Sequence, residues 1–150
     1  AADLLKLVTQ YARSCNIAYH VAAVGDFEVK QKHSGKIPSN RPLMLRLQSA
    51  PKILPIIKRL NPKIVLIGFK AEYNQPAPKL IDISLRSLQK NHADAIVAND
   101  IGKKGSGFHV DTNEVYLVFK DESHVNLPLN SKQEIARQLV DIVGQKILHL

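Results

Sequence analysis

The stretch Ile64-Val65-Leu66-Ile67-Gly68-Phe69 is the strongest β-strand signal in the chain. Branched and aliphatic residues follow one another without alternating with polar ones, so both faces of the strand would be apolar. Such a strand is typical of the centre of a parallel sheet that helices cover on both faces. The stretch therefore predicts an α/β fold, in which neighbouring segments supply further strands and the covering helices.

Segments upstream of this strand alternate between helix and strand patterns. Residues 1–14 carry apolar side chains at helical spacing, and residues 17–24 form another apolar strand. Residues 43–48 alternate with period two, which predicts a strand with one wetter face. The next helix is expected to take Ser49 as its cap, with Pro51 near its first turn.

Downstream segments continue the alternation. We expect a helix over residues 79–91, a short buried strand at 95–98, and an antiparallel pair at 114–120 and 124–127. The sequence Ser131-Lys-Gln-Glu134 is a capping-box signature for the last helix. The predicted fold class is a three-layer Rossmann-like α/β domain with a mostly parallel sheet and a C-terminal β-hairpin, and residues 1–150 suit a single domain.

Composition narrows the choice of partners and compartment. The chain has 21 Lys and Arg against 13 Asp and Glu, a formal net charge of +8, which attracts phosphate-bearing partners. The basic residues are scattered and no aromatic-basic RNA-binding motif is present, so nucleic acid is less expected than a nucleotide. Without a signal peptide, an apolar run long enough for a membrane or a second cysteine beside Cys15, we expect a soluble cytoplasmic protein.

Polar residues follow three of the predicted strands. Asp26 comes after the first strand, residues 70–72 follow the central one, and Asn99-Asp100 follow the next. In a parallel sheet these ends share one edge, where ligands bind. Asp26 or Asp100 could reach a ribose hydroxyl or a magnesium ion. Alternatively, the strands end in polar residues because loops are wet, and either aspartate caps a turn.

The segment from His20 to Ser39 contains the sharpest single candidate. Lys36 lies on a glycine-flanked loop from which its ammonium could swing to a phosphate, although it could equally be a solvated surface lysine. A short β-arm is expected at residues 28–32 or 36–39. Arg86 and Lys90 share one helix face and could neutralise a triphosphate, or could simply keep the helix in water.

Other patterns predict little chemistry. The glycine-rich segment 102–107 lacks the spacing of a phosphate-binding loop and is expected to be a mobile loop. Cys15 has no paired histidine motif, which argues against thiol chemistry. The histidines show no metal-ligand spacing, so zinc is not expected. These histidines are His20, His33, His92, His109, His124 and His149.

Several short motifs, in order along the chain, together resemble one enzyme family. They are Ala22-Ala-Val-Gly-Asp-Phe27, Gly35-Lys-Ile-Pro-Ser39, Pro51-Lys-Ile-Leu54, Gly68-Phe-Lys-Ala-Glu-Tyr73, Ala98-Asn-Asp100, Gly107-Phe108 and Asn113-Glu-Val115. The family is that of the phosphopantothenate-cysteine ligases, or phosphopantothenoylcysteine synthetases, of coenzyme A biosynthesis. The resemblance extends from about residue 16 to residue 145.

The resemblance implies a cytoplasmic, homodimeric ligase whose substrates are phosphopantothenate, cysteine and either CTP or ATP, with Mg²⁺. It implies FMN only if a flavin-dependent decarboxylase domain is fused upstream. Lys36 would be the catalytic residue of the acyl-nucleotide step, and Asn99 and Asp100 would contact substrate or nucleotide. The nucleotide-binding residues carried over are His20, Val21, Ala22, Asp26, Lys36, Pro51, Lys52, Ile53, Leu54, Phe69, Arg86 and Lys90.

The chain also departs from the family pattern. Lys70 and Tyr73 stand where bacterial members have Ala and Thr, which leaves the choice between CTP and ATP open, and Pro38-Ser39 replaces two lysines in the dimer arm. Arg86 and Lys90 replace a lysine pair. The family's glycine-rich first strand would precede Ala1, so we expect the chain to be the C-terminal portion of a ligase domain. The alternative function is a non-enzymatic basic domain that binds nucleotides or nucleic acid.

Overall fold

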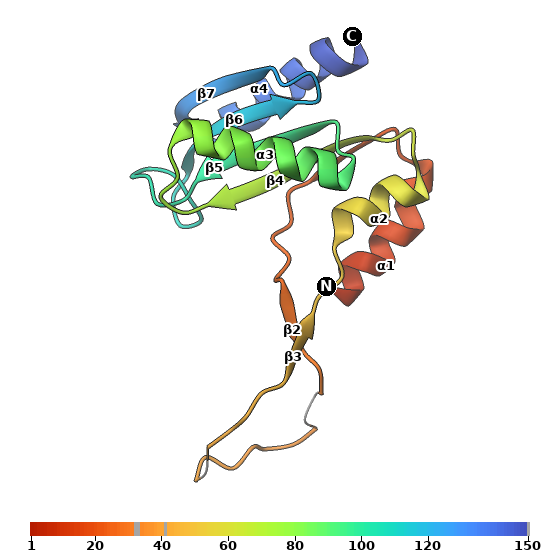
Figure 1. The fold of residues 1–150 in the computed structure, drawn as a ribbon, viewed down its shortest axis with the longest axis vertical. Coiled ribbons are helices and arrows are strands. Elements are labelled where there is room, and N and C mark those ends of the chain that lie inside the picture. The colour runs from red at the N-terminus through yellow and green to blue at the C-terminus, as the bar shows by residue number, and fades with distance from the viewer. Residues whose placement is uncertain (32–33, 41, 150) are drawn as a thin grey trace.

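The computed structural model describes residues 1–31, 34–40 and 42–149. Its main body is a five-stranded sheet in the order β1-β4-β5-β6-β7 (Figure 1). The strands are β1 (Ile17–His20), β4 (Val65–Glu72), β5 (Ala95–Asp100), β6 (Thr112–Phe119) and β7 (His124–Ser131). Strands β1, β4 and β5 are parallel, whereas β6 runs antiparallel to β5, and β7 to β6. The predicted α/β class is confirmed, and the C-terminal hairpin extends the same sheet.

Helices cover both faces of the sheet in three layers. They are α1 (Ala2–Tyr11), α2 (Ile53–Leu60), α3 (Ala77–Asn91) and α4 (Lys132–Val143), with short helical turns at Ala12–Ser14 and Gly144–Leu148. Successive residues of β4 point to opposite faces: Ile67 packs in the core below α4, and Leu66 packs in the core below α1, α2 and α3. In the described residues, no helix is long and apolar enough to cross a bilayer.

Asp94 joins several elements at the amino edge of the parallel strands. Its carboxylate accepts hydrogen bonds from the Leu66 amide at 2.8 Å and from Lys120, and it pairs with Lys58 at 2.7 Å. Burial raises the pKa of Asp94, but the bonds from Lys120, Lys58 and the Leu66 amide together hold that pKa below its ordinary value. The aspartate thereby ties β5 to β4, α2 and β6.

A long arm leaves the sheet after β1 and returns at α2. It contains β2 (Phe27–Val29) and β3 (Leu47–Ser49), which pair antiparallel in a separate two-stranded sheet. The arm projects away from the body, and the loop of residues 34–40 lies at its far end (Figure 1). Its apolar side chains therefore have little of their own chain to pack against.

Four predictions upstream of α2 were wrong in detail. The strand predicted for residues 17–24 ends at His20, and the strand predicted for residues 43–48 keeps only its last two residues. Ser49 lies in β3, and Lys52 precedes α2 without a capping side chain. The sequence offered two ranges for an arm strand. Residues 36–39 do not form a strand. The other range, 28–32, overlaps β2, which runs from Phe27 to Val29, and residue 32 lies outside the described part.

The capping box at the start of α4 is half formed. The Ser131 hydroxyl accepts from the Glu134 amide at 3.1 Å, as predicted. The reciprocal bond is absent, because the Glu134 carboxylate accepts instead from Arg137 and Gln138, both at 2.7 Å. The Ser131 amide donates to the side chain of Asn130 at 2.8 Å.

Candidate functional site

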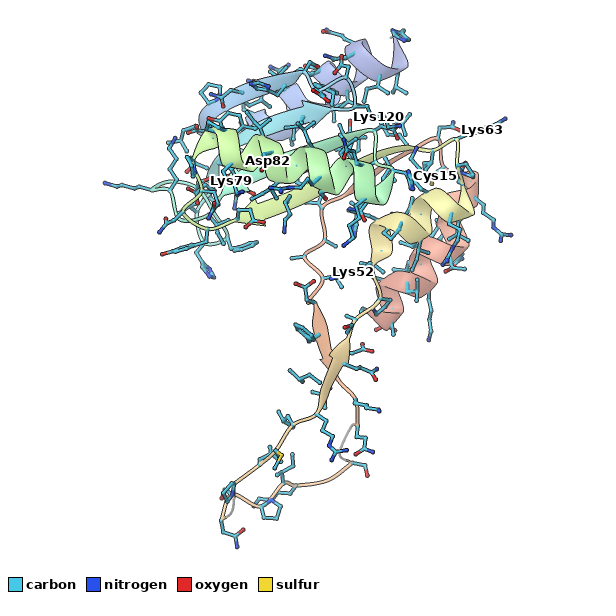
Figure 2. All side chains as sticks on the ribbon, in the orientation of Figure 1. Cys15, Lys52, Lys63, Lys79, Asp82 and Lys120 are labelled. Carbon is cyan, nitrogen blue, oxygen red and sulfur yellow. The ribbon has the colours of Figure 1, made fainter. Side chains whose placement is uncertain are left out.

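Asp26 and Lys52 meet where the arm joins the body (Figure 2). Asp26 lies directly before β2, and its carbonyl accepts from the Ala50 amide at 2.9 Å, which closes the base of the arm. The hydrogen bond from Lys52 holds the pKa of the Asp26 carboxyl below its ordinary value, and the charge of Lys70 acts in the same direction. Two residues predicted separately from the sequence are thus direct partners.

Lys70 and His20 bring further polar groups to the same edge of the sheet. His20 ends β1 opposite Gly68 of β4, and Lys70 follows two residues later. Lys70 pairs with Glu72 at 2.9 Å and remains 42% exposed. Burial lowers the pKa of His20, so this imidazole is mainly neutral near neutral pH. The edge therefore offers solvent-accessible ammonium groups beside a neutral ring.

Asp100 ends β5 and holds two turns together. Its Oδ1 atom accepts from the amides of Asn74 at 2.7 Å and Gly102 at 2.9 Å. A Cβ atom at Gly102 would lie 2.1 Å from the Asn74 side-chain oxygen and 3.0 Å from the Asn74 amide nitrogen, so a larger residue there would displace the Asn74 side chain. The turn-capping alternative for Asp100 is thus the one that the structure supports.

The glycine-rich loop after β5 is held by a polar network. The side chain of Asn113 accepts from Asn99 at 3.3 Å and from the buried Ser106 hydroxyl, and Thr112 donates to the Gly105 carbonyl at 2.6 Å. Lys103 forms an ion pair with Glu114. These contacts fix the segment that the sequence suggested was simply mobile, and they employ Asn99 in the scaffold.

A pocket of about 240 Å³ opens between this loop and the start of α3. Its polar lining consists of Gln75, Asp100, Lys103, Ser106, Glu114 and Tyr116. The pocket lies at the carboxyl ends of β4 and β5, where an open α/β sheet binds its ligands. This pocket is a second candidate surface, and neither Asp26 nor Lys52 lines it.

Lys36, Arg86 and Lys90 lie apart from these groups. Lys36 is exposed on the loop at the far end of the arm. Arg86 pairs with Asp82, which also contacts Lys79 at 3.5 Å on the exposed face of α3 (Figure 2). Among the described residues, no hydrogen bond or ion pair joins these three cations to Asp26, Lys52 or Asp100.

A model of the "DNA/pantothenate metabolism flavoprotein C-terminal domain" family matches residues 1–147. The chain belongs to this family. The bifunctional coenzyme A biosynthesis protein CoaBC of Thermococcus kodakarensis is 40% identical over 126 residues, which are 84% of this chain and 30% of that protein. The CoaBC protein of Methanocaldococcus jannaschii is 36% identical over 147 residues, which are 98% of this chain and 35% of that protein. The chain thus spans about a third of these relatives.

Two solved structures share the fold. The crystal structure of a DNA/pantothenate metabolism flavoprotein from Streptococcus pneumoniae superposes with a TM-score of 0.80 at 29% identity, covering 96% of this chain and 69% of that one. The C-terminal domain of a CoaBC protein superposes with a TM-score of 0.76 at 29% identity, covering 100% and 66%. The Rossmann-like architecture is therefore that of the family.

The apolar candidates of the family motifs differ in what they can touch. Ile53 is 3% exposed, and the side chain of Phe69 packs against the core below α4. Leu54 packs close to Gly68, where an added Cβ would lie 3.1 Å from it. Val21 and Ala22 are exposed in the segment after β1, and Pro51 is half-buried before α2. Ile53 could contact a ligand only through its backbone.

Sequence reasoning did not select Lys103, Glu114 or Tyr116 as site residues, although all three line the pocket. Glu114 and Tyr116 lie on β6, which runs antiparallel and presents its first residues to the carboxyl edge of β5. The sequence-based criterion was a polar residue directly after a parallel strand, and Glu114 and Tyr116 lie within an antiparallel strand. The asparagine-containing motif Asn113-Glu-Val115 was the available signal.

The structure also bears on the predicted magnesium ion. The described residues contain no group of three or more His, Cys, Asp or Glu side chains able to hold a metal. A magnesium ion that arrives on a triphosphate needs only one or two carboxylates, because phosphate and water oxygens complete its shell. Asp26, which is exposed at the arm base, fits that smaller requirement.

Proposed function

We propose that residues 1–150 form a nucleotide-dependent ligase domain that joins 4'-phosphopantothenate to cysteine in coenzyme A biosynthesis, using CTP or ATP. Membership of the family and the names of its bifunctional relatives support the reaction. The observation that carries the proposal is the convergence of Asp26, Lys52 and Lys70 at the carboxyl edge of β1 and β4. Two ammonium groups there suit the phosphates of a nucleotide.

The proposed reaction has two steps. A carboxylate oxygen of phosphopantothenate attacks the α-phosphorus of the triphosphate, and the bond to pyrophosphate breaks. The cysteine amine then attacks the acyl carbon, nucleoside monophosphate leaves with the bonding electrons, and the amine loses its proton to water. This chemistry needs no nucleophilic side chain; it needs cations on the phosphates and oriented substrates. Mg²⁺ would neutralise triphosphate charge when bound, with Asp26 as its carboxylate.

We further propose that the protein is a homodimer joined by the arm. Phe27 and Val29 share one face of the β2-β3 ribbon with Leu47, which is paired to Val29, and these side chains are 66%, 40% and 57% exposed. A two-stranded ribbon alone is only marginally stable in water, so a second arm is its natural cover. Such pairing would also give Lys36, at the far end of the arm, a route to the partner's sheet edge.

The activity assay supplies phosphopantothenate, cysteine and either CTP or ATP to the full-length protein. We expect pyrophosphate release that depends on phosphopantothenate, a marked preference for one base, and phosphopantothenoylcysteine in the mass spectrum. Lys52→Gln should lower kcat/KM by roughly tenfold or more through loss of a phosphate contact, whereas Lys6→Gln on the exposed face of α1 should not. Absence of phosphopantothenate-dependent pyrophosphate release with either nucleotide would refute the proposal.

A further inference from the structure

A basic pocket lies at the opposite edge of the sheet, away from Asp26 and Asp100. It has a volume of about 360 Å³ and is lined by Pro55, Lys58, Arg59, Pro62, His92 and Lys120. We call it the α2-α3 pocket. Lys58 and Arg59 lie in the last turn of α2, His92 follows the C-terminal end of α3, and Lys120 follows β6. Three separate elements thus direct cationic or ionisable side chains to one hollow.

The lining of this pocket contains no carboxylate. The nearest acid is Asp94, whose Oδ2 atom accepts from the Leu66 amide and pairs with Lys58, and whose Oδ1 atom accepts from Lys120. Asp94 holds both ammonium groups in place, and Lys58 also donates to the Ile64 carbonyl at 2.6 Å. Lys120 nevertheless remains 54% exposed, so it keeps donors available to solvent.

The charges of the pocket do not cancel. Lys58, Arg59 and Lys120 are permanent cations that line it. Asp94 offsets one of them, and the C-terminal ends of α2 and α3 contribute about half a negative charge each. A surplus of about one positive charge remains in the hollow. A surplus positive charge in a concave site raises the local concentration of anions.

We propose that the α2-α3 pocket binds a small phosphate-bearing anion. A guanidinium beside ammonium groups matches the oxygens of a phosphoryl group, because Arg donates in a fixed fork and Lys supplies compact charge. Arg59 makes no hydrogen bond or ion pair to any described residue, so its fork is available to the ligand. This site is independent of the proposed ligase centre, since the two lie at opposite ends of the parallel strands.

The test is a ¹H–¹⁵N NMR titration of the chain with inorganic phosphate and with inorganic pyrophosphate at low ionic strength. Saturable shifts are expected at the amides of Arg59, Asn61 and His92. Either binding result supports the proposal. If pyrophosphate binds more tightly than phosphate, the pocket holds two phosphoryl groups; if the two bind equally, it holds one. Shifts confined to residues of the carboxyl edge, or the absence of saturable shifts with either anion, would overturn the proposal.

Matched variants separate this pocket from general surface charge. Arg59→Gln/His92→Asn removes two lining groups and keeps a residue that tolerates the left-handed backbone at position 92, where φ is 53°. We expect it to weaken anion binding about fivefold, or about 1 kcal/mol. Arg13→Gln/His124→Asn removes the same side-chain types elsewhere and should leave binding unchanged. Equal weakening in both variants, or shifts produced by duplex DNA but not by either anion, would refute a built small-anion site.

Discussion

Asp26 and Asp94 are both ion-paired aspartates, but burial gives them different consequences. The Asp26 side chain is 72% exposed and that of Asp94 is 15% exposed. Solvent screens an exposed pair almost completely, whereas a buried carboxylate that loses its partners keeps its desolvation cost. Asp26 can therefore exchange Lys52 for a ligand at little cost in stability, whereas Asp94 stabilises the fold through its ion pairs.

Asp94→Asn should destabilise the protein by about 3 kcal/mol, the lower end of the range for breaking a buried ion pair. The folded-state pKa of Asp94 is depressed, so its contribution is present above the unfolded pKa of about 3.9. That contribution is lost as the pH falls through the folded value. Urea unfolding at several pH values should show the wild-type advantage at pH 7 and its decline below about pH 4.

Asp141→Asn is the control for this measurement, because Asp141 pairs with Arg137 at 2.7 Å on an exposed surface. Its loss should cost no more than about 1 kcal/mol. The role assigned to Asp94 would be contradicted if Asp94→Asn lowered the free energy of unfolding at pH 7 by no more than Asp141→Asn does. It would also be contradicted if the difference between wild type and Asp94→Asn did not change with pH.

Lys36→Gln tests whether this lysine acts in the reaction and not chiefly in binding. The loop is polar and lies far from its own sheet edge, so its ammonium would meet the reacting groups only after closure. In the full-length protein, triphosphate affinity should change by less than roughly tenfold. Turnover should fall by about a hundredfold or more, as for loss of one oxyanion donor.

Calorimetric titration and single-turnover assays separate these two effects of Lys36→Gln. When cysteine is supplied, the acyl-nucleotide should accumulate in the variant and be visible by mass spectrometry. Abolished triphosphate binding with no intermediate would make Lys36 a phosphate anchor, and unchanged turnover would make it a surface lysine.

At the scale of elements, the buried strands and helices could be predicted because their patterns are local. The unbroken apolar run of β4 and the helical stripe of α4 each report which faces are buried. The capping box failed halfway for a local reason as well: hydrogen bonds from Arg137 and Gln138 lower the pKa of Glu134 to about 2 and occupy its oxygens. The local sequence pattern therefore predicts that the helix forms, while competition between hydrogen-bond partners determines how its end is capped.

The arm and much of the candidate site could not be predicted in the same way. Leu43 and Leu45 alternate like a strand, but in the described part of the arm the pairing with β2 starts at Leu47, with one further backbone bond from the Lys30 amide to the Arg46 carbonyl at 3.0 Å. The pairing of Asp26 with Lys52 spans 26 residues and depends on how the arm closes. Contacts of that kind are set by tertiary geometry, which spacing along one chain does not encode.

Leu47→Asp should convert a dimer to a monomer if the arm is the dimer contact. The substitution puts a charge on the apolar face of the ribbon, where burial without a partner would be costly. Val140→Asp on α4 is the control, because Val140 and Leu47 are both 57% exposed. Sedimentation velocity over a range of protein concentrations should show dissociation only for Leu47→Asp. A wild-type protein that is monomeric throughout would contradict the arm dimer.

At the scale of the whole molecule, the net charge is +8, and cations lie at both ends of the parallel strands. Lys52 and Lys70 lie at the carboxyl edge, and Lys58, Arg59 and Lys120 lie at the amino edge. Most carboxylates are already paired within the fold, so the surplus positive charge is surface charge available to anions. Overall charge alone therefore does not distinguish a specific nucleotide site from general attraction to polyanions.

Salt dependence distinguishes the two functions. A protein that binds polyanions displaces counterions from DNA in proportion to its phosphate contacts. Its affinity for duplex DNA should therefore fall by about 10³ or more between 50 and 200 mM salt, and should not depend on the DNA sequence. A ligase site should prefer CTP over ATP, or the reverse, at both salt concentrations, because the base contacts are short-ranged. We expect the second pattern in fluorescence-anisotropy and calorimetric titrations. Tight, salt-sensitive DNA binding with no preference between triphosphates would reject the ligase and leave a basic nucleic-acid-binding domain.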